Sequence, residues 1–352
     1  MLIIESLSKN LGEFALTGVS LSVADGEYFI VLGPTGAGKT ILLETIAGIY
    51  TPDAGRILLN DRDITDVPAK DRNIGMVYQD YMLFPHLTVE ANIGFGLKSR
   101  RADSAFIQKK VQESAELLNI SHLLHRYPGT LSGGEQQRAA IARALVMEPD
   151  ALLLDEPLSA LDVRTRENLR AELARIHKAT GTTIIHITHN FEEVFDLADR
   201  VAIMRGGDVV QVGTPEEIFR RPNSDFVAGF VGMENLFSGT GAPDGTVTVG
   251  DVHIRVDESV TGAVSVAIRP EEILISKAPL PKNGKNVFCG RIESARPNGG
   301  LVRVLVDAGI PFRVTLTRQG FEEVGIAPGD TVYLAFGPSA AHAYPSGAPE
   351  EA

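Results

Sequence analysis

The chain has 352 residues, a length that exceeds one ordinary hydrophobic core and predicts two domains. Its hydrophobic content of 44%, its charged content of 22% and its formal net charge of −12 are typical of a globular protein without a basic face, which argues against nucleic acid as a partner. The single cysteine, Cys289, excludes a disulfide within the chain. The first residues lack the basic segment of a signal peptide, and no apolar run reaches the ~18 residues of a transmembrane helix.

Short apolar segments alternate with helical patterns in the first half of the chain, which predicts an α/β fold with a largely parallel sheet. Residues 27–32 are expected to form a buried strand, and residues 40–47 the helix that follows it. The apolar runs 151–155 and 183–188 are bounded by polar residues, as central strands are. A helix is expected between them at 161–179. Its apolar face contains Leu169, Leu173 and Ile176, and Gly181 is its stop.

The alternation stops between residues 80 and about 130, which predicts a helical insertion in the first domain. Within this insertion, residues 106–124 have the apolar period of an amphipathic helix. The positions expected to be buried are Val111, Ala115, Leu118 and Leu123.

A phosphate loop of the form G-x-x-x-x-G-K-[ST] precedes the helix at 40–47. Its residues are Gly33, Pro34, Thr35, Gly36, Ala37, Gly38, Lys39 and Thr40. The glycines let backbone N–H groups approach a triphosphate, and the helix directs its N-terminal dipole at the same charge. Lys39 supplies a point charge for the β- and γ-phosphates, and Thr40 a hydroxyl for Mg²⁺. The alternative interpretation of this short motif is a glycine-rich turn before a helix.

Two acidic residues, Asp155 and Glu156, stand at the end of the apolar run at 151–155. An aspartate at a strand end can hold Mg²⁺ through water, and a glutamate beside it can polarise an attacking water molecule. Acidic side chains at a strand end can also simply face solvent.

The segment Leu131-Ser132-Gly133-Gly134-Glu135-Gln136 resembles the signature of ATP-binding cassette (ABC) proteins. Other motifs of that family stand in the same order: Gln79 at the Q-loop, Ser159 to Asp162 at the D-loop and His189 at the switch position. The resemblance covers residues 1–231 and implies a P-loop ABC nucleotide-binding domain that contains the helical insertion.

The family resemblance also implies a homodimeric ATPase that uses ATP and Mg²⁺. Residues of one chain would serve one nucleotide: Lys39, Thr40, Gln79, Asp155, Glu156 and His189. Among them, Glu156, His189 and Gln79 would be catalytic, and Thr40, Gln79 and Asp155 would be near the metal. The signature residues Ser132, Gly133, Gly134 and Gln136 would complete the nucleotide site of the partner subunit, from the N-terminus of a helix.

Two further positions are assigned from the resemblance. Family members usually place an aromatic residue near position 11 to stack on adenine, where this chain has Leu11, with Phe14 and Tyr28 nearby. Phe14 either stacks on adenine or belongs to the core. The apolar segment Tyr81 to His86 follows Gln79 and is expected to contact a membrane subunit, with packing against the helical insertion as the alternative.

The second half of the chain predicts a small all-β barrel of the OB type at residues 232–337, followed by a disordered tail at 338–352. Its short apolar runs are separated by Gly, Pro and Asp turns. They lie at 246–249, 252–256, 264–269, 287–292, 301–306, 312–316 and 331–336.

The whole chain resembles the ATPases of molybdate and tungstate importers of the archaeal type, on segments such as Met1 to Ser8, Gly26 to Phe29, the phosphate loop and Gly299 to Val304. This implies an ATPase subunit at the cytoplasmic face of the membrane, bound to integral permease subunits in a complex with an extracytoplasmic substrate-binding protein. It also implies that the C-terminal domain can bind the oxyanion, through Arg291, Arg296, Asn298 and the backbone near Gly299.

Other functions stay open at this point. Importers of sulfate, ferric iron, sugar or polyamine carry similar accessory domains. A non-transport ABC ATPase is a different class, although such proteins usually carry two cassettes or a long coiled coil. A P-loop GTPase or kinase would give the signature segment no role, and no N-K-x-D guanine motif is present.

Overall fold

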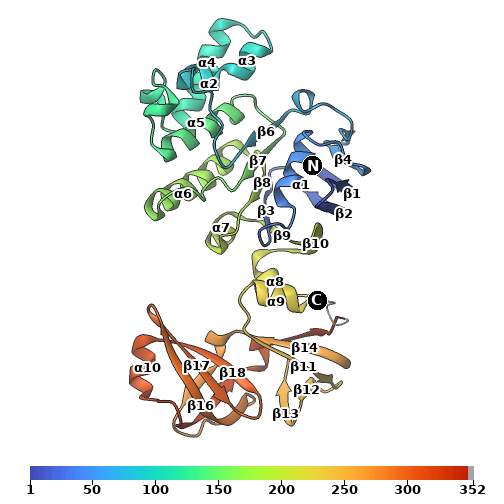
Figure 1. The fold of residues 1–352 in the computed structure, drawn as a ribbon, viewed down its shortest axis with the longest axis vertical. Coiled ribbons are helices and arrows are strands. Elements are labelled where there is room, and N and C mark those ends of the chain that lie inside the picture. The colour runs from blue at the N-terminus through green and yellow to red at the C-terminus, as the bar shows by residue number, and fades with distance from the viewer. Residues whose placement is uncertain (348–352) are drawn as a thin grey trace. The chain divides into compact units, whose positions relative to one another are not determined.

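The computed structural model describes residues 1–347 and divides the chain into two compact units, Met1–Pro215 and Glu216–Ala352 (Figure 1). This division lies before the domain boundary at 231/232 that the sequence suggested. The intervening residues form helices α8 (Pro215–Arg220) and α9 (Asp225–Phe230). Helix α9 contacts strands β11 (Asn235–Gly241) and β14 (Gly262–Ile268), so it packs with the second unit.

A six-stranded sheet forms the centre of the first unit, in the order β10-β9-β3-β8-β7-β6. Its pairs are parallel except for the pair of β9 with β10. The strands are β3 (Tyr28–Leu32), β6 (Ile74–Val77), β7 (Ala151–Asp155), β8 (Thr183–Ile187), β9 (Arg200–Arg205) and β10 (Asp208–Gly213). Strands β3, β7 and β8 are buried along their whole length, as expected of central parallel strands.

The two faces of this sheet are covered differently. On one face, Phe29, Val31, Leu153 and Ile185 pack with helix α1 (Lys39–Ala47) and with a second, antiparallel sheet. The strands of that second sheet are β1 (Leu2–Asn10), β2 (Ala15–Val23), β4 (Ala54–Leu59) and β5 (Arg62–Asp63), and none of them is among the predicted strands. Helices α5 (Gly133–Leu145), α6 (Val163–Thr180) and α7 (Phe191–Leu197) lie on the other face (Figure 1).

The helical insertion contains α2 (Val89–Ile93), α3 (Phe95–Ser99) and α4 (Ser104–Leu117) before α5. Helix α4 begins where the side chain of Asp103 accepts hydrogen bonds from the backbone N–H groups of Ala105 and Phe106. It ends earlier than the predicted 106–124, but Val111, Ala115, Leu118 and Leu123 are buried as predicted. Helix α6 confirms the predicted 161–179 helix, and Gly181 ends it in a left-handed conformation with φ 63°.

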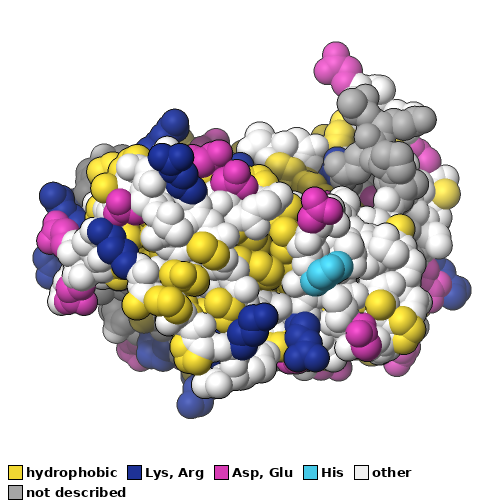
Figure 2. Space-filling model, turned by 90° about the horizontal axis from the view of Figure 1, so that it is seen from below, with side chains coloured by type: hydrophobic (Ala, Val, Ile, Leu, Met, Phe, Trp, Pro, Cys, Tyr) yellow, Lys and Arg dark blue, Asp and Glu magenta, His cyan; other side chains and the backbone are white. Residues whose placement is uncertain are grey.

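The surface carries both apolar and charged groups. Figure 2 shows hydrophobic side chains gathered near the middle of one face, with Lys, Arg, Asp and Glu around them. In the second unit, Leu274 and Leu301 are among the large apolar side chains that stay exposed. Among the described residues, none of the helices has the length and apolar character that crossing a membrane requires.

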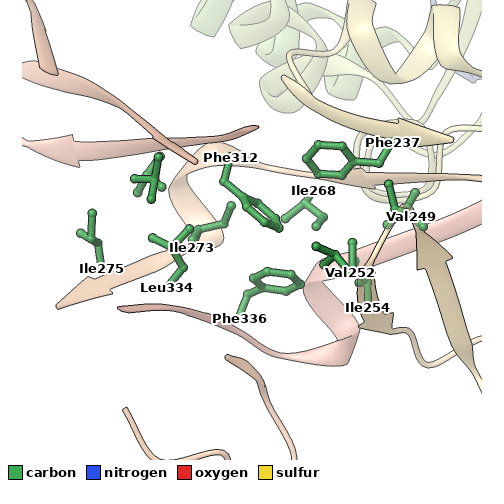
Figure 3. Packing of buried hydrophobic residues seen from close by; sticks show 14 of the residues in the cluster. Phe237, Val249, Val252, Ile254, Ile268, Ile273, Ile275, Phe312, Leu334 and Phe336 are labelled. Carbon is green, nitrogen blue, oxygen red and sulfur yellow. The ribbon is translucent and has the colours of Figure 1, made fainter. Parts of the chain in front are cut away.

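The second unit consists of two antiparallel five-stranded sheets that share one hydrophobic core. The first sheet has the order β13-β12-β11-β14-β20, and the second β15-β19-β16-β17-β18. Their further strands are β12 (Thr246–Val249), β13 (Val252–Arg255), β15 (Leu274–Ser276), β16 (Asn286–Asn298), β17 (Leu301–Asp307), β18 (Pro311–Thr317), β19 (Thr331–Phe336) and β20 (Ala341–Pro345), with helix α10 (Arg318–Val324) after β18. Figure 3 shows Phe237, Phe312 and Phe336 pointing into this core between the sheets. The predicted all-β unit is confirmed.

The prediction of a disordered tail from residue 338 is wrong for its first part. Residues Ala341–Pro345 form β20, which pairs with β14 along Val264–Ile268. In β20, the alternating residues Ala341 and Ala343 are buried in the core. Tyr344 donates a hydrogen bond to Asp225. The composition of the segment hid a short strand that only its partner specifies. Residues 348–352 of the predicted tail lie outside the described residues.

Candidate nucleotide-binding site

Four predicted site segments converge at the carboxyl edge of the six-stranded sheet. The phosphate loop follows β3, Gln79 comes shortly after β6, Asp155 ends β7 and His189 follows β8. Strands β3, β8, β7 and β6 are consecutive neighbours in the sheet, and all run parallel. Ligands of open α/β sheets bind at this edge, so the topology assembles residues that are more than 150 positions apart into one site.

The phosphate loop has the backbone that its glycines allow. Gly36 and Gly38 have φ of 81° and 95°, in the left-handed region, and a Cβ at Gly38 would stand 2.6 Å from the ring of Phe14. Lys39, which is 7% exposed, donates hydrogen bonds to the carbonyl oxygens of Gly33 (2.7 Å) and Pro34 (2.9 Å). Burial lowers the pKa of Lys39, although the charges of Glu156 and Asp155 oppose that shift. The loop therefore holds one cation inside a ring of backbone groups at the start of α1.

Oxygen donors suited to Mg²⁺ lie beside this loop. The Thr40 hydroxyl donates to Oδ1 of Asp155 at 3.4 Å, so two hard oxygen ligands already face one point. Burial raises the pKa of Asp155, although the hydrogen bond from Thr40 lowers it. Sequence reasoning missed Glu44 on α1, whose pKa is raised by burial and then by Asp155. Its position four residues after Thr40 places it on the same helix face, which is a signal that the sequence contains.

Glu156 and His189 are brought together as predicted. Oε2 of Glu156 lies 3.3 Å from Nδ1 of His189, whose side chain is 64% exposed. Glu156 has a φ of 44°, a left-handed conformation that is uncommon for a residue other than glycine, and its N–H donates to the carbonyl of Ile187 at 3.0 Å. The backbone of β8 thus fixes the residue that follows β7, and it directs the carboxylate toward the switch histidine.

Gln79 is exposed, and no described hydrogen bond joins it to Thr40 or Asp155. Its neighbour Tyr78 lies close enough to Asp155 that the carboxylate adds to the rise that burial causes in the tyrosine pKa. The structure therefore places Gln79 at the correct edge of the sheet without showing a contact to the metal ligands.

The segment Tyr81 to His86 is only partly the exposed patch that the sequence suggested. Tyr81 is 7% exposed, whereas Met82 is 55% exposed. Phe84 is half-buried because its ring packs on Phe95 at 4.6 Å and beneath the guanidinium of Arg143 at 5.4 Å. Arg143 of α5 also donates to the backbone oxygens of Tyr81 (3.2 Å) and Met82 (2.8 Å). Both alternatives named for Phe84 are therefore visible, a partly open surface and a contact with the helical insertion.

The signature residues lie at the N-terminus of α5. Ser132 caps the helix: its Oγ accepts from the N–H of Glu135, whose carboxylate accepts from the Ser132 N–H at 2.7 Å. Ser132 and Gly133 are exposed, whereas Gly134 is buried against α6, where a Cβ would stand 2.9 Å from Thr165. Gln136 donates to the carbonyls of Pro128 and Leu131, both at 3.2 Å. The helix end is thus open to a ligand while its own cap is satisfied.

This signature is not part of the phosphate loop's site within one chain. Figure 1 shows α5 and α1 separated by the strands β6, β7 and β8. No hydrogen bond or ion pair in the described chain joins residues 33–40 to residues 132–136.

The structure narrows the choice of an adenine platform. Tyr28 is 1% exposed in the core, which removes it as a stacking surface. Phe14 is partly buried and packs against the core beside Gly38, and Leu11 is 40% exposed. Phe14 therefore has a packing role that does not depend on a nucleotide.

The residues predicted to bind an oxyanion lie along one hairpin of the second unit. Arg291 donates to the carbonyl of Gly329 (3.1 Å), and Arg296 stands opposite Arg303 in the register of β16 and β17. Two cations directly opposite each other repel, but Arg303 also pairs with the carboxylate of Glu234 at 3.2 Å, which compensates part of that charge. Asn298 and Gly299 are at the exposed end of the hairpin. A separate cavity of ≈330 Å³ is lined by three other cations, Arg255, Lys282 and Lys285, together with His253.

Comparison with known proteins agrees with this division of the chain. Residues 16–159 match the ABC transporter family and residues 266–343 match the TOBE domain. A molybdate/tungstate import ATP-binding protein of Pyrococcus horikoshii is 49% identical, over 98% of this chain and 100% of its own length. A sulfate/thiosulfate import ATP-binding protein of Caulobacter vibrioides is 43% identical, over 86% and 88%. A spermidine/putrescine import ATP-binding protein of Acidothermus cellulolyticus is 40% identical, over 96% and 92%.

Solved structures resemble the chain over part of its length. A nucleotide-free ATP-binding cassette from an ABC transporter is 27% identical, with a TM-score of 0.59 over 65% of this chain and 98% of its own. A subunit of an ABC transporter complex from Clostridium perfringens is 33% identical, with a TM-score of 0.58 over 62% and 90%.

Proposed function

The chain belongs to the ATP-binding subunits of ABC transporters, and we propose that it is the ATPase of an importer whose cargo is molybdate or tungstate. The observation that carries this proposal is the 49% identity to a molybdate/tungstate import protein, which extends through both units. The sulfate and polyamine relatives named above are 43% and 40% identical, over somewhat less of the chain. Cargo of those classes remains the second candidate.

The reaction is in-line attack of water on the γ-phosphate of ATP, which requires positioning and charge stabilisation more than covalent chemistry. The backbone of residues 33–40 binds the phosphates, and Lys39 stabilises the charge that develops on them. Glu156 accepts the proton of the attacking water, and His189, 3.3 Å from its carboxylate, holds that side chain in place.

Thr40 and Asp155 are the residues that would hold Mg²⁺, with Gln79 as a third ligand from the end of β6. A bound Mg²⁺ would neutralise phosphate charge and fix the angle of the terminal phosphate. Chelation of divalent cations should therefore abolish hydrolysis while leaving part of the affinity for ATP. Substitution of Asp155 by Asn should raise the concentration of Mg²⁺ needed for half-maximal activity.

A second copy of the chain completes each nucleotide site. Ser132 and Gly133 present the exposed N-terminus of α5, with Gly134 and Gln136 directly behind them, and a helix N-terminus binds phosphate oxygens. Helices α5 and α1 lie apart within one chain (Figure 1). In a two-fold dimer, the signature residues would therefore face the phosphate loop of the partner subunit.

The membrane partner is proposed to dock near Phe84 and to hold the ATPase at the cytoplasmic face of the membrane, in one complex with an extracytoplasmic binding protein. The support is the aromatic pair Phe84 and Phe95, whose rings are both partly exposed. Beside this pair lies a cavity of ≈670 Å³, and His86, Leu87 and Ile107 are among the residues that line it. Replacing Phe84 by Asp should weaken assembly with the permease while sparing the basal ATPase activity. Tyr127, an exposed aromatic of the same unit, provides a matched control as Tyr127→Asp.

Transport by the complete complex tests the cargo. With permease and binding protein reconstituted in vesicles, molybdate and tungstate should stimulate ATP hydrolysis and be taken up, and a large excess of sulfate should compete poorly. Uptake of sulfate or a polyamine at the same protein concentration, without molybdate uptake, would assign the chain to one of the other import classes.

A further inference from the structure

A chain of three buried polar side chains crosses the core of the first unit next to the switch loop. Tyr28 on β3, His186 on β8 and Glu193 on α7 are 1%, 0% and 3% exposed. We propose that these three residues form a line of polar contacts, one hydrogen bond and one ion-pair contact, that positions His189 against Glu156 for ATP hydrolysis. The inference rests on the proposed function, because it assigns a purpose to side chains that support the hydrolytic site without contacting the nucleotide.

Two polar contacts join the three side chains. Oη of Tyr28 lies 3.0 Å from Nδ1 of His186, and Nε2 of His186 lies 3.4 Å from Oε2 of Glu193. Burial, and then the charge of Glu193, raises the pKa of Tyr28, so the phenol keeps its proton and has it available for the contact with Nδ1. Nε2 of His186 faces the Glu193 carboxylate at ion-pair distance and has no hydrogen-bond partner among the described residues, so Glu193 is the only charged group placed to pair with it.

Glu193 is the ionised end of this chain. Burial by itself would raise its pKa, but the contacts with His186 and Thr188 lower the pKa overall. Arg166 of α6 adds a weaker favourable charge. A carboxylate that is 3% exposed is stable only while such partners are present, so Glu193 holds α7 to β8.

Two of the three polar side chains, His186 and Glu193, flank the loop that carries His189. His186 precedes His189 by three positions and Glu193 follows it by four, so the anchor points flank residues 188–190. Within that loop, the Thr188 hydroxyl accepts from the N–H of Asn190 at 3.0 Å. His189 itself is 64% exposed and has Glu156 as its described side-chain contact, so the position of its ring depends on the loop.

The third residue connects the loop to the phosphate-binding strand. Tyr28 begins β3, which leads into Gly33, and β3 pairs with β8 in register from Tyr28 and Ile184 to Val31 and Ile187. Tyr28 thereby fixes His186 relative to the strand that carries the phosphate loop. Three apolar side chains would fill this space at least as stably, since replacing a buried polar network by hydrophobic groups is often neutral or stabilising. The polar contacts fix the orientation of the side chains, which apolar packing does not do.

The test separates position from stability. In the full-length protein, the triple variant Tyr28→Phe, His186→Leu and Glu193→Leu replaces each of the three polar side chains by an apolar one. We expect this variant to fold with a thermal midpoint near that of wild type and to bind ATP with little change in KM. Its kcat should fall on the order of 10- to 100-fold, because a displacement of about 1 Å in a reacting group has effects of that size. A folded triple variant with wild-type kcat would overturn the inference.

Two single variants keep the proposal testable if the triple variant does not fold. His186→Gln retains an acceptor for Tyr28 and a donor for Glu193, and it should recover most of the activity that His186→Leu loses. His177→Phe is the matched control, since His177 packs edge-on against the other side of Tyr28 at 5.2 Å and should affect stability without lowering kcat. Equal losses of kcat in His186→Gln and His186→Leu, or in His177→Phe and His186→Leu, would contradict a directional role. Failure of the wild-type chain to hydrolyse ATP would instead overturn the proposed function.

Discussion

The two units of the molecule concentrate their functional residues in opposite ways. In the first unit, parallel strands end at one edge, and motifs from residues 33 to 189 meet there because every strand that carries one runs in the same direction. In the second unit, antiparallel strands alternate direction, and the cations lie on a hairpin and around a separate cavity. Parallel topology therefore brings motifs that are far apart in the sequence into one site. The antiparallel strands of the second unit instead leave its basic residues at two separate places.

The strongest way to break this comparison is to remove the predicted general base. Glu156→Gln should lower kcat by about 10²–10⁴-fold while ATP binding persists, because the amide cannot accept the proton of water. Steady-state ATPase assays and equilibrium nucleotide binding measure the two quantities. Asp150→Asn, at the opposite end of β7, is the matched control and should leave both nearly unchanged. Wild-type turnover in Glu156→Gln would place the base elsewhere.

The convergence at the sheet edge is incomplete without a second chain. Lys39→Ala and Ser132→Arg should each be inactive alone. Their equimolar mixture should regain at most about a quarter of wild-type activity, because half of randomly mixed dimers are mixed and each of these keeps one of two sites. ATPase activity of the mixture against each variant alone is the measurement. No recovery in mixed dimers, shown to exist by differential tagging, would argue against shared sites.

The separate cores of the two units predict separate losses of structure. Phe312 is fully buried in the second unit, with Phe237 at 5.2 Å and Phe288 at 5.4 Å. Phe312→Ala should destabilise that unit by about 3–5 kcal/mol and leave the ATPase activity of the first unit largely intact. Peptide-resolved hydrogen exchange should show the loss of protection after residue 216. Phe29→Ala, in the core of the first unit, should give the reverse pattern. A uniform loss of protection in both units would show that they unfold together.

The smallest expected effect concerns the location of an anion-binding site in the second unit. If the hairpin pair of Arg296 and Arg303 binds an oxyanion, Arg296→Gln should weaken molybdate binding about tenfold, the size of one charged hydrogen bond. Titration calorimetry on the full chain measures this affinity. Arg255→Gln, in the separate cavity, should leave it unchanged. The reverse ranking would move the site to that cavity, and binding by neither route would leave the unit as a scaffold.

The sequence by itself determined what depends on local spacing. The phosphate loop, the strand that ends in Asp155 and Glu156, helix α6 with its stop at Gly181 and most strands of the second unit follow from patterns a few residues long, since backbone chemistry and apolar period act over that range. The family order of motifs added the expectation that a second chain completes the site.

Only the tertiary structure decided what depends on partners distant in sequence. Strand β20 looked like a disordered tail, because its pairing with β14 is invisible in its own composition. The sequence left two alternatives open for the segment Tyr81 to His86, and the fold buries Tyr81 while it packs Phe84 against Phe95 and Arg143. The line of Tyr28, His186 and Glu193 had no local signal, since each residue alone is an ordinary member of a strand or helix. Long-range contacts select among conformations and environments that local sequence permits, and for that reason these features emerged only once the chain was folded.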